Sequence, residues 1–402
     1  MSRHAGKPVL VVGTGPVGFC TALRLAQAGV PVTLIEQDAE LQDDLRASTF
    51  HPPTLEMLDE LALTRGLLDE GLRTDKWQIR LHETHEKAEF DLDAIRDDTR
   101  YPFRLQVEQR VLCRLAAEKV AAEPLIDLRM NTELLAFKQN DKCVQARLRS
   151  PDGDLYEIST PFMIAADGAK SITRKLLDLP FEGLTYPEMT ILATTHFPFQ
   201  KHLPGLSNVN YVWYSGGTFS LLRLPDVWRV SLYPDENESE AESLEAASLQ
   251  RKLQRVVPRD ESYVVEESRP YRIHQRIVSD YRAGRILLVG DAAHLNSPSG
   301  GMGMNGGIHD AFNLTEKLPL VWRGGAEPES LDLYTRQRRP IAREQILQQA
   351  HANRTRMQER DPRKRRAELA RLQAIAGDPQ QSREYLLRSS MITGLREAKA
   401  LT

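Results

Sequence analysis

The chain has 402 residues, enough for two or three domains at about 150 residues each. Its 41% hydrophobic and 27% charged residues are typical of a folded globular protein, and 53 basic against 56 acidic residues leave a net charge of −3. This balance argues against a general attraction to nucleic acid or anionic membranes. Three widely separated cysteines, without clustered histidines, exclude a disulfide framework and a zinc site.

The N-terminal segment has the pattern of a strand, a helix and a second strand. Residues 8–12 form a short apolar run, residues 16–28 carry apolar side chains at helical spacing, and residues 32–36 form a second strand. This order is typical of the start of a doubly wound parallel sheet. The first apolar run is too short for a signal peptide, and none reaches the roughly 18 residues of a membrane span. We therefore expect a cytoplasmic protein with no membrane partner.

Later segments differ in pattern. Apolar and polar residues alternate between 185 and 275, which predicts an antiparallel sheet whose first clear strand covers residues 190–197. The last 70 residues are charged and helical in pattern. Helices are also expected over residues 53–63, 107–121 and 307–319, and strands over 77–81, within 125–165 and over 284–289.

These patterns predict an α/β protein whose nucleotide-binding domain is built from discontinuous segments. We expect that domain to comprise residues 1–70, 100–180 and 280–330. The inserted, mainly antiparallel sheet domain would comprise residues 71–99 and 181–279, followed by a C-terminal helical region over 331–402. A cofactor clamped between the two domains would suit this layout.

The first motif with a chemical meaning is Gly13-Thr14-Gly15-Pro16-Val17-Gly18, at the turn from strand to helix. Its glycines allow a tight turn, a close approach of backbone to a pyrophosphate, and close helix packing, and the helix N-terminus favours negative charge. Glu36 ends the second strand, 23 residues after Gly13, where a carboxylate would accept a ribose hydroxyl. Together they predict a site for the adenosine half of NAD or FAD.

A second motif follows the strand at 284–289. It contains Asp291 and then Pro298, Gly300 and Gly301, and continues as Gly303-Met304-Asn305 before a helix. Dense glycine lets backbone pack against a flat ring, and the following helix N-terminus can stabilise negative charge on it. A carboxylate at the strand end, such as Asp291, can accept hydrogen bonds from sugar-alcohol hydroxyls.

These two motifs, with DGAKSITR at 167–174, resemble those of the single-component flavoprotein aromatic hydroxylases, the p-hydroxybenzoate hydroxylase group. The resemblance spans about residues 5–340 in the same order. It implies a Rossmann-like FAD-binding domain of the glutathione-reductase type, with NADH or NADPH as a transient reductant. It also implies hydroxylation of a small phenolic or heteroaromatic ring by O2 through a flavin hydroperoxide. Homodimers are common in this group.

The resemblance assigns cofactor roles to individual residues. Arg46 matches the arginine that pairs with the FAD pyrophosphate, and Gln109 matches a flavin-contacting residue, with Arg110 as the neighbouring alternative. Asp291 would bind the ribityl chain, Pro298 would face the ring, and residues 303–305 would surround a flavin carbonyl with backbone donors. The expected FAD-binding set is Gly13, Gly15, Pro16, Val17, Gly18, Glu36, Gln37, Arg46, Gln109, Asp167, Gly168, Asp291, Pro298, Gly301, Gly303, Met304 and Asn305.

Two departures from the group pattern are mild. Thr14 stands where small residues are usual, and Ser297-Pro298 stands where two prolines are frequent. Asp167 and Gly168, with Ser171 and Arg174, match a motif tied to both FAD and NAD(P)H binding.

Catalytic residues are harder to assign than cofactor residues. A phenolic substrate gains reactivity on deprotonation, which favours a tyrosine or histidine near the ring. We therefore expect Tyr211 and His196, together with Pro298, at the reaction centre. Tyr211 and Trp213 share one face of a strand and could form an aromatic wall, although both could equally pack in the core. The same insert also offers Tyr214, Arg223 and His274.

Three other functions fit the same motifs. The first is an oxygenase of the same fold that performs epoxidation, oxidative decarboxylation or ring expansion on a secondary metabolite or quinone. The second, a halogenase, is disfavoured because no WxWxIP segment is present. The third is a flavin-binding redox sensor without turnover.

Overall fold

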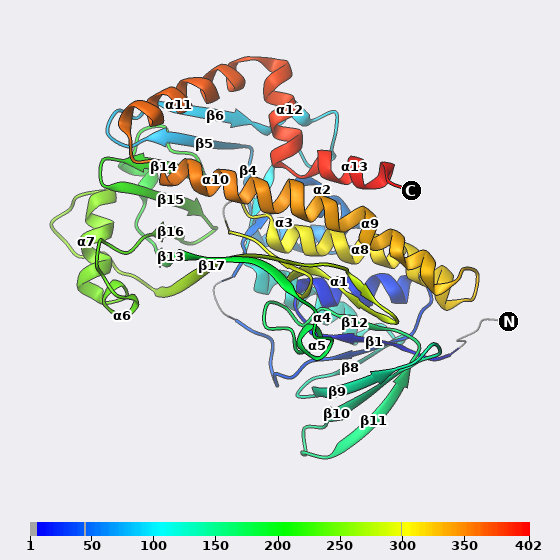
Figure 1. Cartoon of the computed structure of the whole chain (residues 1–402). Helices are drawn as coiled ribbons and strands as arrows, with labels where there is room; N and C mark the ends of the chain where they lie inside the picture. Colours follow the sequence, from blue (N-terminus) through cyan, green and yellow to red (C-terminus); the bar gives the residue numbers. More distant parts are fainter. Residues whose placement is uncertain (1–5, 44–45, 299) are drawn as a thin grey trace.

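The structure, a computed structural model, describes residues 6–43, 46–298 and 300–402. Its first sheet has six strands in the order β18-β19-β12-β1-β2-β8 (Figure 1). Five strands are parallel and β18 is antiparallel. The strands are β1 (Val9–Val12), β2 (Val32–Ile35), β8 (Ile126–Arg129), β12 (Met163–Ala165), β18 (Arg282–Ala283) and β19 (Ile286–Leu288).

This sheet is covered on both faces, which explains why its strands are continuous apolar runs. Helices α1 (Pro16–Gln27), α4 (Gln109–Ala121) and α8 (Gly303–Trp322) lie on one face. There Val9 and Val11 belong to the larger core. Leu10 and Val12 point to the other face, against a three-stranded antiparallel sheet. That small sheet consists of β9 (Glu133–Gln139), β10 (Val144–Arg149) and β11 (Leu155–Thr160).

A second, eight-stranded sheet has the order β20-β17-β13-β16-β15-β14-β5-β6. Its pairings are antiparallel except for β14 with β5. The strands are β5 (Lys76–Leu81), β6 (Lys87–Asp91), β13 (Phe181–Thr195), β14 (Val209–Tyr214), β15 (Gly217–Arg223), β16 (Trp228–Leu232), β17 (Glu267–Val278) and β20 (His294–Leu295). All but β20 come from the predicted insert, while the exact domain division stays a prediction.

The expected strand over residues 190–197 is wrong in its limits. Strand β13 begins at Phe181 and ends at Thr195. Its register with β17 shifts between Thr185 and Met189, so Tyr186-Pro187-Glu188 interrupt the ladder. Because a bulge breaks the alternation of apolar and polar residues, the first part of the strand carries no period-2 signal.

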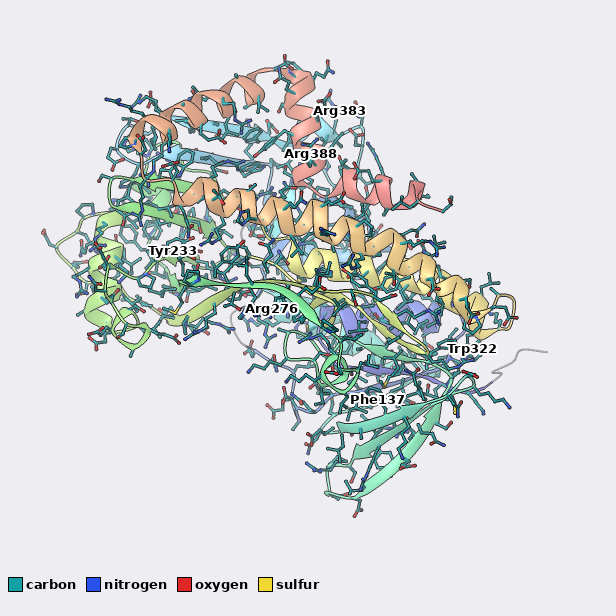
Figure 2. The ribbon with its side chains drawn as sticks, in the orientation of Figure 1. Phe137, Tyr233, Arg276, Trp322, Arg383 and Arg388 are labelled. Carbon is teal, nitrogen blue, oxygen red and sulfur yellow. The ribbon has the colours of Figure 1, made fainter. Side chains whose placement is uncertain are left out.

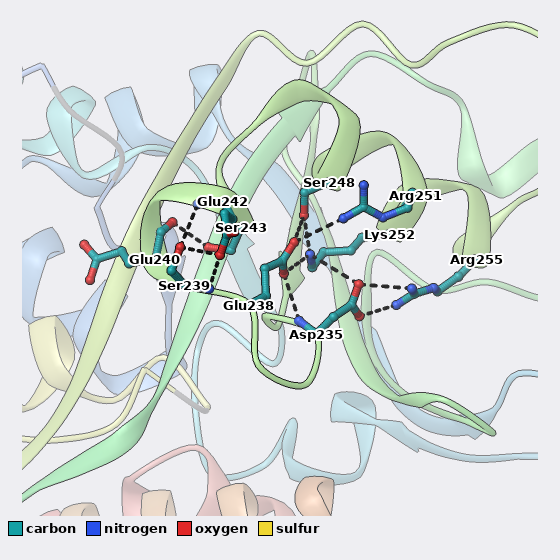
Figure 3. A network of polar contacts seen from close by, with 10 residues as sticks. All are labelled: Asp235, Glu238, Ser239, Glu240, Glu242, Ser243, Ser248, Arg251, Lys252 and Arg255. Carbon is teal, nitrogen blue, oxygen red and sulfur yellow. Dashed lines mark hydrogen bonds and ion pairs between the residues drawn. The ribbon is translucent and has the colours of Figure 1, made fainter.

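One face of the eight-stranded sheet packs against α7 (Ala246–Val256), beside α6 (Glu240–Ser243). A polar network fixes these helices to the end of β16 (Figure 3). Lys252 is only 3% exposed and lies 2.5 Å from a carboxylate oxygen of Glu238, and Arg255 pairs with Asp235 at 2.5 Å. Two acids of the run before α7, Asp235 and Glu238, are therefore paired with basic residues of the helix.

The chain ends in helices that cover the remaining faces. These are α9 (Asp332–Ile341), a π-helical segment (Ala342–Leu347), α10 (Gln348–Gln358), α11 (Pro362–Gly377), α12 (Pro379–Ser389) and α13 (Ile392–Ala400). The α9–α10 rod runs beside α8, while α11 and α12 pack on β5 and β6 (Figure 1). Arg383 of α12, labelled in Figure 2, pairs with Asp98 at 2.8 Å. Among the described helices, none has both the length and the apolarity to cross a membrane.

Short elements connect these layers. A small sheet consists of β3 (Thr49–Phe50), β7 (Arg104–Gln106) and β4 (Leu72–Thr74), and helices α2 (Pro52–Glu60) and α3 (Thr64–Glu70) lie between β3 and β4 in the chain. Helix α5 (Ile172–Leu176) contacts β9. Single 3-10 turns cover Leu92–Ile95, Phe199–Lys201, Gly290–Ala292 and Pro328–Leu331.

Candidate active site

Three glycines, Gly13, Gly15 and Gly18, have different roles in the turn between β1 and α1. A Cβ on Gly13 would lie 2.5 Å from the carbonyl oxygen of Ala166, and one on Gly18 would lie 1.9 Å from that of Gly13. A Cβ on Gly15 would meet nothing within 4 Å. Gly15 also precedes the first turn of α1, which begins with Pro16 and Val17 and has no capping side chain among the described residues. Open space thus lies before helical N–H donors, as a pyrophosphate requires.

Glu36 is held at the end of β2 by the motif itself. One carboxylate oxygen accepts hydrogen bonds from the backbone N–H and the hydroxyl of Thr14, both at 2.9 Å. The other accepts from the Asp38 N–H at 3.1 Å, and Gln37 is exposed beside it. Thr14, a departure from the usual pattern, therefore orients the acid. A carboxylate retains lone pairs for a further hydroxyl donor.

Arg46 and Gln109 come together although they are far apart in sequence. The Gln109 N–H donates to the carbonyl of Ala47 at 3.0 Å, at the first turn of α4. Arg110 instead points outward and pairs with Asp43 at 3.2 Å. Both residues therefore contact the segment around Arg46, Gln109 through its backbone and Arg110 through its side chain.

Arg229 of β16 ties the same segment to the eight-stranded sheet. Its side chain is 4% exposed and donates to the carbonyl of Arg46 at 2.5 Å and to the Ser48 hydroxyl at 3.0 Å. It also donates to both carboxylate oxygens of Glu108, at 2.8 and 2.9 Å. Sequence analysis missed Arg229, which lies at an inward-facing position of a strand with apolar neighbours.

The motif at 167–174 reaches the Asp291 loop through one side chain. Arg174 donates to the carbonyls of Ala292 at 2.9 Å and Ala169 at 2.7 Å. Ser171 caps α5 by accepting the Arg174 N–H at 3.0 Å. Asp167 accepts the Thr173 N–H through one oxygen, while its other oxygen is buried without a partner among the described residues. Gly168, with φ of +71°, makes the turn between them.

Asp291 is half-buried where these segments meet. Burial raises the pKa of its carboxyl above the ordinary value, and His294, Arg46 and Arg174 oppose that shift. Arg46 and Arg174, which belong to two different motifs, therefore both lie within electrostatic reach of Asp291. The three motifs converge on one site.

The glycine-rich loop continues from Asp291 to the start of α8. Pro298 is exposed, and its carbonyl accepts the Gly301 N–H at 3.0 Å. The Asn305 side chain donates to the carbonyls of Thr49 at 2.8 Å and Gly301 at 2.6 Å, and accepts the His51 N–H at 3.0 Å. Asn305 thus has its side chain bound to protein, which leaves the backbone N–H groups of α8's first turn, including Gly303 and Met304, to face a ligand.

The eight-stranded sheet presents an open face toward this loop. Leu192, Ser231, Ser220 and Tyr211 form a row across β13, β16, β15 and β14, and each is half-buried. Burial and the nearby Asp291 raise the pKa of Tyr271, on the same face of the sheet, to about 12. This row forms a wall that faces the motif residues. Of its members, sequence analysis found only Tyr211.

A polar cluster lies at one end of that row. Burial raises the pKa of Tyr211, while Arg104 and a backbone hydrogen bond with Gly300 oppose the shift. His51 forms a hydrogen bond through Nε2 with the carbonyl of Gly300 at 2.9 Å. Sequence analysis missed Arg104 and His51. The available signal was one charged residue inside the apolar strand around residues 103–107.

Two other residues that we expected near the substrate ring, His196 and Trp213, lie apart from this cluster. His196 is exposed just beyond β13, with its Nδ1 2.8 Å from the carbonyl of Asp226 and its Nε2 3.8 Å from Glu266. We therefore assign it no role. Trp213 shares the face of Tyr211 but is fully buried, and its Nε1 donates to the carbonyl of Arg356 at 3.1 Å. It packs in the core beneath α10.

A cavity in the eight-stranded sheet domain lies outside the site described above. A cavity of about 430 Å³ opens at the outer strand ends, between Tyr186, Tyr233 and Arg360, and the network of Figure 3 forms one wall. Of the residues considered from the sequence, Tyr214 lines it, while Tyr211, His196, Pro298 and the expected FAD-binding residues do not. Within the described part of the chain, no group of three or more His, Cys, Asp or Glu residues could hold a metal ion.

The converging residues fit FAD. The space at Gly15, the oriented acid Glu36 and the unpartnered oxygen of Asp167 supply groups that complement a dinucleotide. A glycine-rich turn from strand to helix of this kind is a recurring binding motif for FAD and NAD.

Comparison with known proteins agrees with this class. A model of the FAD binding domain family matches residues 7–350. The crystal structure of p-nitrophenol 4-monooxygenase from Pseudomonas putida DLL-E4 is similar with a TM-score of 0.90 and 32% identity, covering 97% of this chain and 98% of that one. The para-nitrophenol 4-monooxygenase of Pseudomonas sp. strain WBC-3 is 31% identical over 393 residues, 96% of each chain. The 6-hydroxy-3-succinoylpyridine 3-monooxygenase of Pseudomonas putida strain DSM 28022 / S16 is 31% identical over 336 residues, 82% of this chain and 84% of that protein.

The chain therefore belongs to the FAD binding domain family of flavoprotein monooxygenases. Within that class it is an FAD-dependent aromatic hydroxylase that uses NAD(P)H and O2. The predicted fold class, cofactor and reaction class are confirmed. The individual site residues stay predictions.

Proposed function

We propose that this enzyme hydroxylates a small phenol whose ring lies between the glycine-rich loop and the half-buried row on the eight-stranded sheet. The observation that carries the proposal is the place of Tyr211, whose hydroxyl ends the row beside Gly300. The relatives named above act on para-nitrophenol and on a hydroxylated succinoylpyridine, which are both rings that carry a hydroxyl group. This supports a hydroxylated ring as the substrate class.

In this proposal FAD occupies the converging residues in an extended form. Glu36 and Gln37 would hold its adenosine half, and Arg46, with the turn of Gly15, Pro16 and Val17, would hold its pyrophosphate. Asp167, Gly168, Gln109 and Asp291 would hold its centre, and Pro298, Gly301, Gly303, Met304 and Asn305 would surround its ring. Gly13 and Gly18 would shape the turn without contacting the cofactor.

The protein's own groups contribute orientation and charge. Bound FAD would supply the redox chemistry, in which NAD(P)H is the two-electron reductant, one atom of O2 enters the ring and the other becomes water. Because burial raises the pKa of Tyr211, its hydroxyl stays protonated near neutrality and can donate a hydrogen bond to the ring oxygen. The apolar members of the sheet face would exclude water from the reacting ring.

Turnover with a defined substrate tests the proposal. NADH and NADPH oxidation by the purified holoenzyme would be measured with para-nitrophenol, hydroxybenzoates and hydroxypyridines, and the product would be analysed after reaction in ¹⁸O2. We expect oxidation to accelerate with one ring class and the product to carry one labelled oxygen atom. Bound FAD without stimulation by any of these rings would contradict the proposal.

A matched pair of variants locates the ring oxygen. Tyr211→Phe should retain FAD and lower kcat/KM by about 100-fold, the scale of a lost proton-transfer or charged hydrogen-bond group. Tyr214→Phe, on the opposite face of the same strand, should change kcat/KM by less than about threefold.

We also infer a cytoplasmic location, because the enzyme draws on the NAD(P)H pool. A homodimer is the expected assembly, and light scattering of the purified holoenzyme would measure it.

A further inference from the structure

Arg104 is a buried cation without a balancing anion. Its side chain is 3% exposed, and the guanidinium carbon lies 4.8 Å from the ring centroid of Trp77. Among the described residues the groups that act on its charge are Tyr211 and Tyr385 and include no carboxylate, and its Nε is buried without a hydrogen-bond partner. A buried charge is costly unless it is paired, and a cation–π contact offsets only part of that cost.

The groups that face Arg104 are all uncharged near neutral pH. They come from each element packed against it: Tyr211 of β14, Tyr385 of α12, Trp77 of β5, and His51 after β3. Burial, followed by the charge of Arg104, lowers the pKa of His51 to about 3. The cluster therefore carries one net positive charge.

The cluster also adjoins the reaction centre. Tyr211 hydrogen-bonds with Arg104 and with the Gly300 backbone, and His51 binds the Gly300 carbonyl at 2.9 Å. Trp77 packs edge-on to Tyr211, with ring centroids 6.1 Å apart, and lies stacked with Tyr385 at 6.1 Å. The uncompensated charge is thus held by aromatic rings next to the glycine-rich loop.

We propose that Arg104 is a specificity-determining residue whose guanidinium pairs with the anionic oxygen of a phenolate substrate beside Tyr211. The inference rests on the proposed function and narrows it to acidic phenols bound as phenolates. The substrate would supply the negative charge that the folded protein lacks, while Tyr211 donates a hydrogen bond to the same oxygen. A neutral ring of the same size would leave Arg104 unpaired.

Equilibrium binding to the oxidised holoenzyme, without NAD(P)H, tests the inference. Kd would be measured from the change in flavin absorbance with 4-nitrophenolate at pH 8 and with neutral nitrobenzene. In Arg104→Gln we expect about 10- to 100-fold weaker binding of the phenolate, the scale of a charged hydrogen bond, and less than threefold change for nitrobenzene. Arg104→Lys, which keeps the charge, should restore part of the phenolate affinity.

A second buried arginine provides the matched control. Arg80 of β5 is 1% exposed and lies away from Trp77, with its guanidinium bonded to the carbonyl of Pro204 at 3.2 Å. Arg80→Gln should leave the ratio of the two Kd values unchanged. Equal losses for both ligands in Arg104→Gln, or no loss for the phenolate, would overturn the inference.

The wild-type protein gives a measurement that needs no variant to fold. The absorbance of 4-nitrophenol reports its ionisation, so a pH titration of the bound ligand gives its pKa. We expect an ionisation constant at least about tenfold larger than in water, as for an acid beside a cation. A bound pKa equal to or above the value in water would overturn the inference.

The two proposals fail in different ways. Normal turnover of 4-nitrophenol by Arg104→Gln would contradict the role of Arg104 and leave the hydroxylase function intact. Selective phenolate binding through Arg104, without an oxygenated product, would contradict the proposed phenol hydroxylation alone.

Discussion

At the scale of single residues, Asp291 lies where separate motifs of the chain meet. It follows the 286–288 strand and lies near Arg46 from one motif and Arg174 from another. Its half-buried carboxylate has no hydrogen-bond donor among the described side chains. A ribityl hydroxyl would supply that donor, which makes Asp291 a sensitive probe of cofactor binding.

We expect Asp291→Ala to purify largely without flavin, because the variant loses a carboxylate acceptor in the cofactor path. The measurement is the ratio of FAD to protein absorbance after gel filtration. Asp152→Ala, at an exposed turn, is the control and should retain the wild-type ratio. Full FAD content in Asp291→Ala would show that the loop is wrongly assigned.

A second buried acid, Asp310 of α8, serves stability. It accepts hydrogen bonds from His294 Nε2 at 2.8 Å and from Arg338 Nε at 2.6 Å, and all three side chains are at most 1% exposed. Asp310→Asn should lower the free energy of unfolding at pH 7 by about 3 kcal/mol, because it leaves a buried arginine unpaired. Urea unfolding would measure this loss of stability. The control is Asp332→Asn, which removes the partly exposed ion pair of Asp332 with Arg282 and should change the free energy of unfolding by less than about 1 kcal/mol.

This acid also predicts a pH dependence. Burial raises the pKa of Asp310, but interactions with Arg338 and His294 outweigh this effect and hold the pKa below its usual 3.8. A depressed pKa in the folded state stabilises the protein above the unfolded value, and that contribution disappears as pH falls through the folded value. The stability difference between wild type and Asp310→Asn should therefore shrink below about pH 4. A constant difference from pH 7 to pH 3 would contradict this assignment.

At the scale of elements, the turn between β1 and α1 has some glycines that the fold requires and one that cofactor binding requires. Gly18→Ala should destabilise the apoprotein, because its Cβ would overlap the Gly13 carbonyl at 1.9 Å. Gly15→Ala meets no atom within 4 Å, so apoprotein stability should stay within about 1 kcal/mol while FAD binds at least about tenfold more weakly. Thermal melts of the apoproteins and FAD titrations would measure both. Unchanged FAD affinity in Gly15→Ala would place the pyrophosphate elsewhere.

Elements with a strong local pattern could be predicted from sequence. The first strand, helix and second strand, and the loop from Asp291 to Asn305, carry apolar periodicity and glycines at spacings that few other structures need. The small sheet of β3, β7 and β4 has strands of only two or three residues, too short for any periodicity. It positions Arg104, so that residue was missed. The row from Leu192 to Tyr211 depends on pairing between distant strands, which periodicity does not encode.

At the scale of the whole molecule, Arg229 couples the two sheets. It joins β16 to the Arg46–Ser48 segment and to Glu108, ahead of α4. Arg229→Met should lower stability by about 2 kcal/mol, since Glu108 is left unpaired but partly exposed, and should speed FAD release. The rate of FAD release would be measured from flavin fluorescence after rapid dilution of the holoenzyme. Arg223→Met, on the adjacent strand, is the control and should release FAD at the wild-type rate. Equal release rates for both variants would contradict the coupling.

The order of strands in the six-stranded sheet has a consequence for synthesis of the chain. Strand β12 lies between β1 and β19, so the nucleotide domain gains its last central strand only after residue 288 has been made. Tyr334 then closes the same layer by donating to the carbonyl of Leu288 at 2.7 Å. During much of translation, one hydrogen-bonding edge of β12 therefore awaits β19, which is encoded more than a hundred residues downstream. Binding of FAD must therefore follow the synthesis of β19. Nascent chains that stall before this point would expose unpaired strand edges, which chaperones bind.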